Sequence, residues 1–138
     1  MKPQQLDIAY CIKHASFVNG LREKRGGWQE WDWGWDTVVG ELIPPSIGDR
    51  VRLLGDVWLP TEGDALGMLA EALPRLGEGD YGWALEGAND ADRYQAWIPG
   101  YLDEGTGFLD EDIYRTDWLE TPLIALLELL RAVEGKGE

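Results

Sequence analysis

The sequence contains only one cysteine, Cys11, and one histidine, His14. A single thiol excludes an intrachain disulfide and is typical of proteins of the reducing cytoplasm. A zinc site needs several cysteine and histidine ligands together, so these two residues predict no zinc centre. A thiol nucleophile with a histidine base would have to use this pair, but no oxyanion hole is evident beside it. We therefore predict no catalytic residues.

Long hydrophobic runs are also absent. The longest, Leu123–Val133, is interrupted by two charged residues and is too short to span a bilayer. The N-terminal segment is interrupted by Asp7 and Lys13 before it reaches the apolar length of a signal peptide. These features predict a cytoplasmic protein without a membrane partner.

The eighteen glycines are scattered and form no phosphate-binding loop. Two short acidic runs, Asp90–Asp92 and Asp110–Asp112, could offer oxygen ligands to a divalent cation. Neither continues into the glycine-centred loop of an EF-hand, and Tyr94 stands where a third oxygen ligand would be needed. We interpret both runs as solvated loops and predict no metal ion and no cofactor.

The distribution of charge is the strongest signal in the sequence. The chain has a formal net charge of −14, and residues 78–120 hold twelve acidic residues against two basic ones. Residues 1–27 instead carry a net charge of +3. The acidic segment repels nucleic acid and anionic membranes and attracts cationic partners, so we predict a basic protein surface as the partner and no direct contact with nucleic acid. The alternative is that the acidic residues only keep the protein soluble.

Tryptophan is abundant, with eight in 138 residues and four between Trp28 and Trp35. The alternation of Trp31, Trp33 and Trp35 predicts one face of a strand, whereas Trp28, Trp31 and Trp35 would share one face of a helix. The nearby glycines favour the strand. Most tryptophans are largely buried, but one or two exposed ones would be effective anchors for a partner.

Three segments have the apolar spacing of amphipathic helices: residues 6–18, 62–73 and 123–133. Asn19-Gly20 is expected to end the first helix, and Thr61 to cap the second. In the third, Thr121 is the expected cap and Pro122 the first helical residue. Its apolar arc is so broad that we expect burial on two sides.

Three segments are predicted as strands: residues 36–43, 50–59 and 81–86. The tryptophan segment is a further candidate strand, residues 93–98 are ambiguous, and residues 22–27 and most of 101–117 are expected to be loops. We predict an α+β fold in a single domain over residues 1–138. It consists of an antiparallel sheet of three to five strands covered by an N-terminal, a central and a C-terminal helix.

These observations favour a small acidic binding protein, of the inhibitor or immunity type, over an enzyme. Its carboxylates would stand where a nuclease or another nucleic-acid-binding protein expects phosphate groups. Aromatic side chains among the acids would add contact area. The predicted partner-binding residues are Asp90, Asp92, Trp97, Tyr101, Asp103, Glu104, Asp110, Glu111, Asp112, Tyr114, Trp31 and Trp33.

Two other functions stay open. The chain could be a structural or assembly subunit that forms homo-oligomers through Leu123–Val133 and the tryptophan segment, with the acids only solubilising it. It could also be a small enzyme that uses paired carboxylates, with or without a divalent cation.

Overall fold

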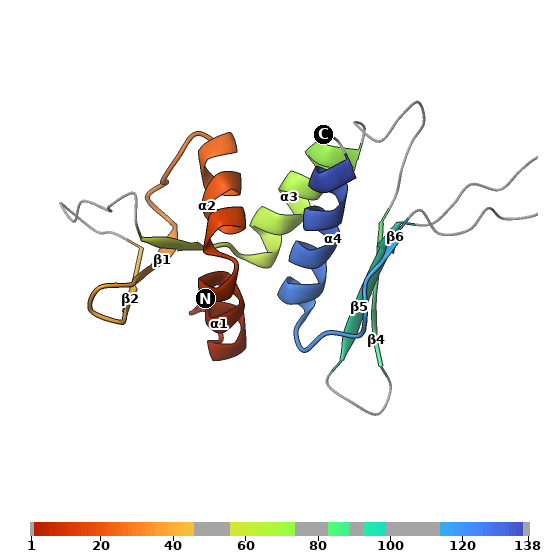
Figure 1. Ribbon diagram of the computed structural model, residues 1–138, viewed down its shortest axis with the longest axis horizontal. Helices are drawn as coiled ribbons and strands as arrows, with labels where there is room; N and C mark the ends of the chain where they lie inside the picture. Colours follow the sequence, from red (N-terminus) through yellow and green to blue (C-terminus); the bar gives the residue numbers. More distant parts are fainter. Residues whose placement is uncertain (1, 46–55, 74–82, 89–92, 99–113, 137–138) are drawn as a thin grey trace, which may run out of the picture. The chain divides into compact units, whose positions relative to one another are not determined.

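The computed structural model of the chain describes residues 2–45, 56–73, 83–88, 93–98 and 114–136. These residues form four helices and six short strands, and the strands belong to two antiparallel three-stranded sheets (Figure 1). The predicted α+β class is confirmed. The chain divides into two compact units, Met1–Thr61 and Glu62–Glu138, which are described in turn. That both units belong to one domain stays a prediction.

The first unit begins with two helices, α1 (Gln5–Lys13) and α2 (Ala15–Lys24), separated at His14. The prediction of one helix ending at Asn19-Gly20 is therefore wrong. An Asn-Gly pair ends a helix when one of its residues adopts positive φ, but the positive φ angles lie later, at Gly26 (105°) and Gly27 (94°). Both expected stop residues instead lie inside α2.

The first sheet has the strand order β2-β1-β3. Its strands are β1 (Trp33–Asp36), β2 (Glu41–Ile43) and β3 (Val57–Leu59). The strand predicted for the tryptophan segment is confirmed for β1. In β3 only the end of the predicted 50–59 strand is seen, because residues 50–55 lie outside the described part. The helices α1 and α2 both contact β3.

The continuous strand predicted for residues 36–43 is wrong, because a turn divides it. The Asp36 Oδ1 atom accepts hydrogen bonds from the backbone N–H groups of Val38 (2.9 Å) and Val39 (3.2 Å). Gly40 closes the turn with φ of 77° and donates its N–H to the Asp36 carbonyl at 2.8 Å. Asp36 thus forms an Asx turn. The hydrogen bonds of this turn prevail over the preference of Val38 and Val39 for a β-strand.

The second unit contains α3 and α4 and a sheet of strand order β4-β5-β6. Its elements are α3 (Glu62–Ala72), β4 (Ala84–Gly87), β5 (Tyr94–Ile98), β6 (Tyr114–Arg115) and α4 (Pro122–Lys136). The central helix predicted for residues 62–73 is confirmed. The strand predicted at 81–86 is found as β4, but it pairs with β5 of its own hairpin and not with the earlier strands. The single predicted sheet is therefore corrected to two.

Helix α4 follows its predicted start closely. The Thr121 hydroxyl accepts the N–H of Ile124 at 3.1 Å, and Pro122 is the first helical residue. The helix contacts α3 and also β5, whose inward residues Ala96 and Ile98 have no exposed surface. Burial on two sides is thereby confirmed. The apolar side chains of Leu123–Val133, which were proposed for an oligomer interface, are already buried within a single chain. An interface through this helix stays a prediction, and little apolar surface remains exposed for it.

Candidate functional site

The acidic segments predicted to bind the partner connect to both ends of β5. Residues 99–113 hold five acidic residues and no lysine or arginine, and they join β5 to β6. Asp90 and Asp92 join β4 to β5. Because the strands are antiparallel, these connections leave opposite ends of a five-residue strand, about 13 Å apart. Eight predicted site residues lie in these segments, outside the described part: Asp90, Asp92, Tyr101, Asp103, Glu104, Asp110, Glu111 and Asp112.

Two further predicted site residues, Trp97 and Tyr114, lie on opposite faces of the second sheet. Trp97 pairs with Arg115, whose guanidinium lies 4.6 Å from the centre of the indole ring. Tyr114 pairs with Ile98, which is fully buried on the face that α4 covers. Since paired residues share a face, Tyr114 points inward and only Trp97 belongs to the outer face.

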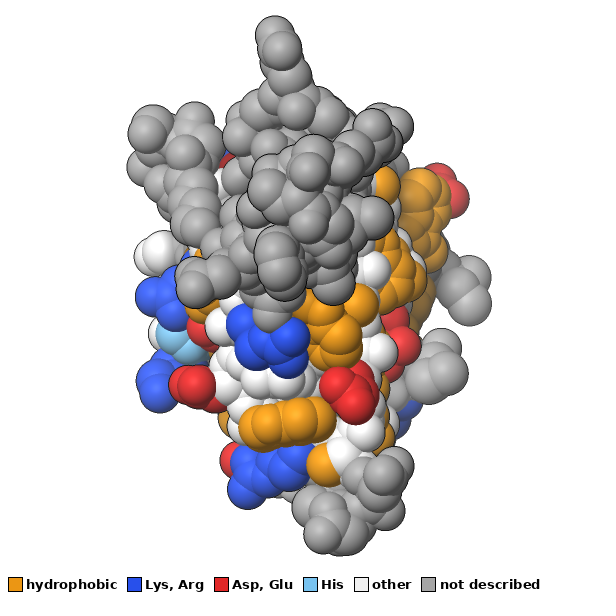
Figure 2. Space-filling model, turned by 90° about the vertical axis from the view of Figure 1, so that its right-hand side faces the viewer, with side chains coloured by type: hydrophobic (Ala, Val, Ile, Leu, Met, Phe, Trp, Pro, Cys, Tyr) orange, Lys and Arg blue, Asp and Glu red, His pale blue; other side chains and the backbone are white. Residues whose placement is uncertain are grey.

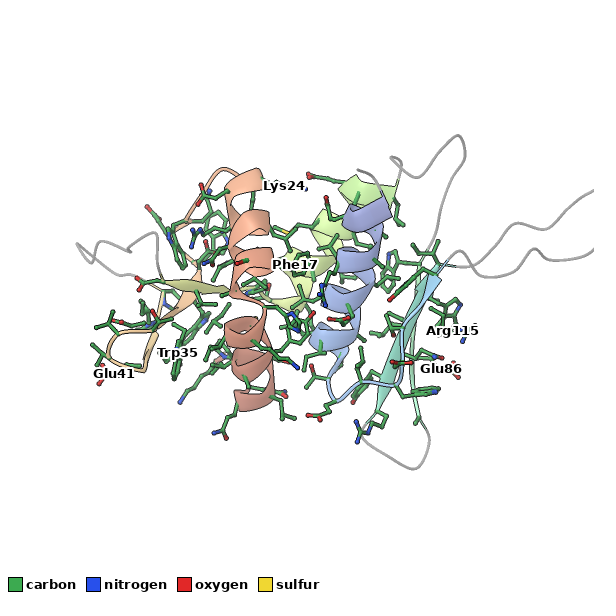
Figure 3. All side chains as sticks on the ribbon, in the orientation of Figure 1. Phe17, Lys24, Trp35, Glu41, Glu86 and Arg115 are labelled. Atoms are coloured by element: carbon green, nitrogen blue, oxygen red, sulfur yellow. The ribbon has the colours of Figure 1, made fainter. Side chains whose placement is uncertain are left out.

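The outer face of the sheet is the side turned away from α4. Glu86 and Arg115 both point away from α4 there (Figure 3). Hydrophobic, acidic and basic side chains lie side by side on this face (Figure 2). Glu86 pairs with Gln95 across the β4–β5 ladder, so the outer face runs over all three strands. We call it the outer sheet face.

A β-bulge interrupts the edge of this sheet. The ladder pairs Trp97 with Arg115, but it pairs Tyr94 with Leu119. Two residues of β5 separate those positions, whereas three residues separate them on the opposing segment. One residue is therefore extra, and the hydrogen bond from the Thr116 N–H to the Ala96 carbonyl (2.9 Å) locates it after Thr116. Asp117 and Trp118 together stand opposite Gln95.

Side chains hold the bulge in place. The Ala96 N–H donates to the Thr116 hydroxyl at 3.0 Å, and that hydroxyl donates to the Asp117 carbonyl at 2.9 Å. The Gln95 amide donates to the Thr116 carbonyl at 2.8 Å and accepts from Arg115 at 2.9 Å. Gln95 and Thr116 are both buried. The backbone polar groups that lose their ladder partners at the bulge thus form hydrogen bonds with side chains. These hydrogen bonds fix the local backbone.

The bulge turns Trp118 toward solvent. In a regular ladder Trp118 would stand opposite Tyr94 and share its inward face. The extra residue puts Leu119 there instead, and Trp118 is 43% exposed. Trp118 was not among the residues predicted from the sequence. The acidic residues on both sides of it, Asp117 and Glu120, are the only sequence feature that could have indicated it.

Trp31 and Trp33, the remaining predicted site residues, lie in the first unit. Trp31 is 62% exposed, as expected for an anchor, while Trp33 is half-buried and pairs with Leu59. The twelve predicted residues are therefore divided between two units. Trp31 and the acidic segments were grouped only because both are residue types that are common in binding sites, and they belong to different units.

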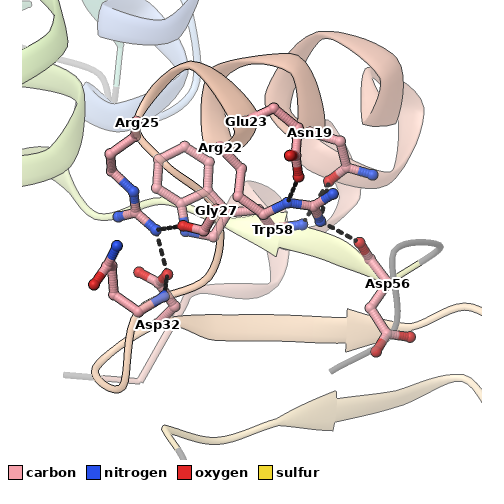
Figure 4. Close-up of polar contacts among 9 residues, drawn as sticks. Asn19, Arg22, Glu23, Arg25, Gly27, Asp32, Asp56 and Trp58 are labelled. Carbon is pink, nitrogen blue, oxygen red and sulfur yellow. Dashed lines mark hydrogen bonds and ion pairs between the residues drawn. The ribbon is translucent and has the colours of Figure 1, made fainter. Parts of the chain in front are cut away.

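Trp28 of the tryptophan segment and Trp58 of β3 each lie against an arginine, and Figure 4 shows the polar contacts of the two arginines. The guanidinium of Arg22 lies 4.7 Å from the ring centre of Trp28, and that of Arg25 lies 4.3 Å from the ring centre of Trp58. Arg25 also forms an ion pair with the buried Asp32. Arg22 and Arg25 thus make contacts within the protein. They contribute less to a positive surface than the net charge of residues 1–27 suggests.

Gly34 explains why glycine interrupts the tryptophan segment. A Cβ atom at this position would lie 3.0 Å from Cη2 of Trp28. That distance is shorter than most Cβ contacts in proteins, so a larger residue would require the indole ring to shift by a few tenths of an ångström. The glycine therefore lets the indole ring pack closely against β1.

The environment of Cys11 does not favour the thiolate that a nucleophile needs. Burial, followed by the nearby Asp7 carboxylate, raises the pKa of the Cys11 thiol to about 12, so the thiol keeps its proton at neutral pH. His14 lies beyond the end of α1, with its ring centre 4.5 Å from that of Tyr10. Among the described residues no three acidic, cysteine or histidine side chains converge as a metal site, and both acidic runs considered for a cation lie outside this part.

No helix in the described part of the chain has the length and apolarity needed to cross a membrane. Comparisons with models of protein families, with curated proteins and with solved structures found no match.

Proposed function

We propose that this protein is a non-enzymatic binder of the inhibitor or immunity type, which occupies the nucleic-acid-binding surface of a basic partner protein. The observation that carries the proposal is the charge of residues 99–113, which contain five carboxylates and no basic residue. They follow directly from β5, the central strand of its sheet. A cytoplasmic location fits a protein whose only cysteine is a free thiol.

Carboxylates outside this segment add to the same negative field. Glu86, Asp117 and Glu120 are exposed and form no ion pair with any residue in the described ranges. Negative charge that is not neutralised internally remains available to a partner. These three groups belong to the same unit as residues 99–113.

The physical basis is that carboxylate and phosphate oxygens accept hydrogen bonds from the same donors. Arginine binds both groups through paired N–H donors, and lysine binds both as a point charge. A concentrated negative field also accelerates the encounter with a basic surface, and added salt weakens it.

The test is displacement of nucleic acid. A fluorescent DNA duplex is bound to each member of a panel of basic DNA-binding proteins and nucleases, and this protein is added at low and at high ionic strength. We expect it to displace the duplex from at least one member at low salt, with a clear loss at high salt. Failure to bind any member at low salt would contradict the proposal.

A matched pair of variants separates local from overall charge. The first converts Glu104, Asp110, Glu111 and Asp112 to their amides. The second converts four exposed acids with no ion pair in the described part: Glu30, Glu41, Glu62 and Glu71. Each removes four negative charges from the total of −14. We expect the first to weaken displacement about tenfold or more and the second to weaken it much less. Equal losses would mean that the acids act only through total charge.

A further inference from the structure

The β-bulge of the second unit displays a tryptophan that the rest of the ladder would bury. Trp118 is 43% exposed because Leu119 takes its place opposite Tyr94. Its indole ring makes no hydrogen bond or ring contact within the described ranges. Proteins use bulges to re-aim side chains near functional sites, and tryptophan is strongly enriched among the residues that dominate binding.

The backbone that carries Trp118 is fixed. The Thr116 hydroxyl accepts a hydrogen bond from the Ala96 N–H at 3.0 Å, and the Gln95 side-chain amide donates to the Thr116 carbonyl at 2.8 Å. Both side chains are more than nine-tenths buried. Since this backbone is already held, it does not have to become ordered when a partner binds the ring.

The charge around the ring selects the kind of group that can bind. Asp117 precedes Trp118 and Glu120 follows Leu119, and both carboxylates are exposed without an ion pair in the described part. An indole face beside carboxylates attracts a cation, which gains from the ring quadrupole and from charge-assisted hydrogen bonds. Arg115 does not fill this position, because its guanidinium lies over Trp97 and donates to Gln95.

Arginine is the cationic side chain that this molecule already uses on tryptophan. Three guanidinium groups lie between 4.3 and 4.7 Å from indole centres, at Trp28, Trp58 and Trp97. Trp118 offers the same ring to solvent. The geometry points to the bulge at Asp117-Trp118 as the docking point for an arginine side chain of a basic protein partner. This inference rests on the proposed function and names one contact within it.

The probe is a blocked hexa-arginine peptide, added to the full chain at low ionic strength. The signal is the indole N–H resonance of Trp118 in a nitrogen–proton spectrum, assigned by its loss in Trp118→Phe. We expect this resonance to shift on titration. Trp118→Leu is expected to weaken peptide binding about 3- to 30-fold, while Trp118→Phe retains most of it because an aromatic face remains.

Trp83→Leu is the matched control, since Trp83 is also exposed but has no acidic residue within two positions of it in the sequence. We expect less than about a twofold effect from it. For charge, Asp117→Asn with Glu120→Gln is compared with Glu30→Gln with Glu41→Gln, and only the first pair should weaken binding, by up to about fivefold. Circular dichroism and melting temperature check that each variant is folded.

The outcomes separate this inference from the proposed function. If the peptide does not bind, or binds Trp118→Leu and the wild type equally, the docking point is wrong, even where nucleic acid is displaced from a basic protein. Equal losses for Trp83→Leu and Trp118→Leu also overturn it. If Trp118→Leu loses the peptide but no basic protein releases its nucleic acid, the arginine site stands and the proposed function fails.

Discussion

The side chain of Asn19, in the middle of α2, accepts the backbone N–H of Trp58 in β3 through Oδ1 at 3.0 Å. One turn further along the helix, Arg22 donates to the Asp56 carbonyl at 3.0 Å. Two helix side chains therefore satisfy the free edge of β3 in the way that a neighbouring strand would. This explains why the helix continues through an Asn-Gly pair, and how a three-residue strand is kept in the first sheet.

We expect Asn19→Ala to lower the free energy of unfolding by about 1–3 kcal/mol, because the buried N–H of Trp58 would lose its acceptor. The measurement is urea denaturation followed by circular dichroism. Ser16→Ala is the control, since Ser16 lies exposed in the same helix and should change stability by less than about 0.5 kcal/mol. Similar midpoints for Asn19→Ala and Ser16→Ala would show that the edge of β3 does not depend on Asn19.

The ion pair between Arg25 and Asp32 yields a second prediction. The Asp32 side chain has no exposed surface and that of Arg25 is 19% exposed, so removal of one partner leaves a largely buried charge. We expect Asp32→Ala to cost about 3 kcal/mol or more. The double variant Arg25→Met with Asp32→Leu should lose less than Asp32→Ala, because no unpaired charge remains. Denaturation of the single and double variants measures this, and a double variant weaker than Asp32→Ala would contradict it.

These contacts mark the limit of what the sequence could reveal. Thr121, Pro122 and the apolar spacing after them predict α4 correctly, because capping and periodicity are local properties. The end of α2 was mispredicted because Asn19 bonds to a strand thirty-nine residues away. No local pattern contains such a long-range partner.

The candidate site shows the same division. Composition identified the acidic segments, and alternation placed Trp33 and Trp35 in a strand. The bulge could not be foreseen, since it depends on how residues 115–119 align with β5. For that reason Trp118 was missed, while Tyr114, which the ladder turns inward, was included.

The cap of α4 gives a third prediction. Thr121 is 3% exposed, and its hydroxyl accepts the Ile124 N–H at the helix start. We expect Thr121→Ala to destabilise the protein by about 1 kcal/mol, and Thr121→Ser to restore most of that, because serine supplies the same oxygen. Thermal unfolding of the two variants decides the matter. If the serine variant is as unstable as the alanine variant, the methyl group and not the hydrogen bond stabilises this position.

The buried thiol of Cys11 predicts how stability depends on pH. Its pKa is raised from the ordinary value of 9.0 to about 12, chiefly by burial and secondly by Asp7. Between these values the unfolded chain loses the thiol proton while the folded chain keeps it. The unfolded state then binds fewer protons, so the free energy of unfolding must fall as pH rises, by up to about 1.4 kcal/mol per pH unit. Below pH 9 this contribution is fully present.

The variant Cys11→Ala isolates this effect. Cys11 is 1% exposed, so alanine leaves a small cavity and lowers stability at neutral pH. Its loss of stability between pH 9 and 11 should nevertheless be smaller than that of the wild type, because no thiol remains to titrate. Urea denaturation at several pH values gives both slopes. The thiol should also react with a disulfide reagent at pH 8 far more slowly in the folded protein than in urea. Equal slopes for the two proteins, or rapid reaction of the folded thiol, would show that the environment of Cys11 does not hold its proton.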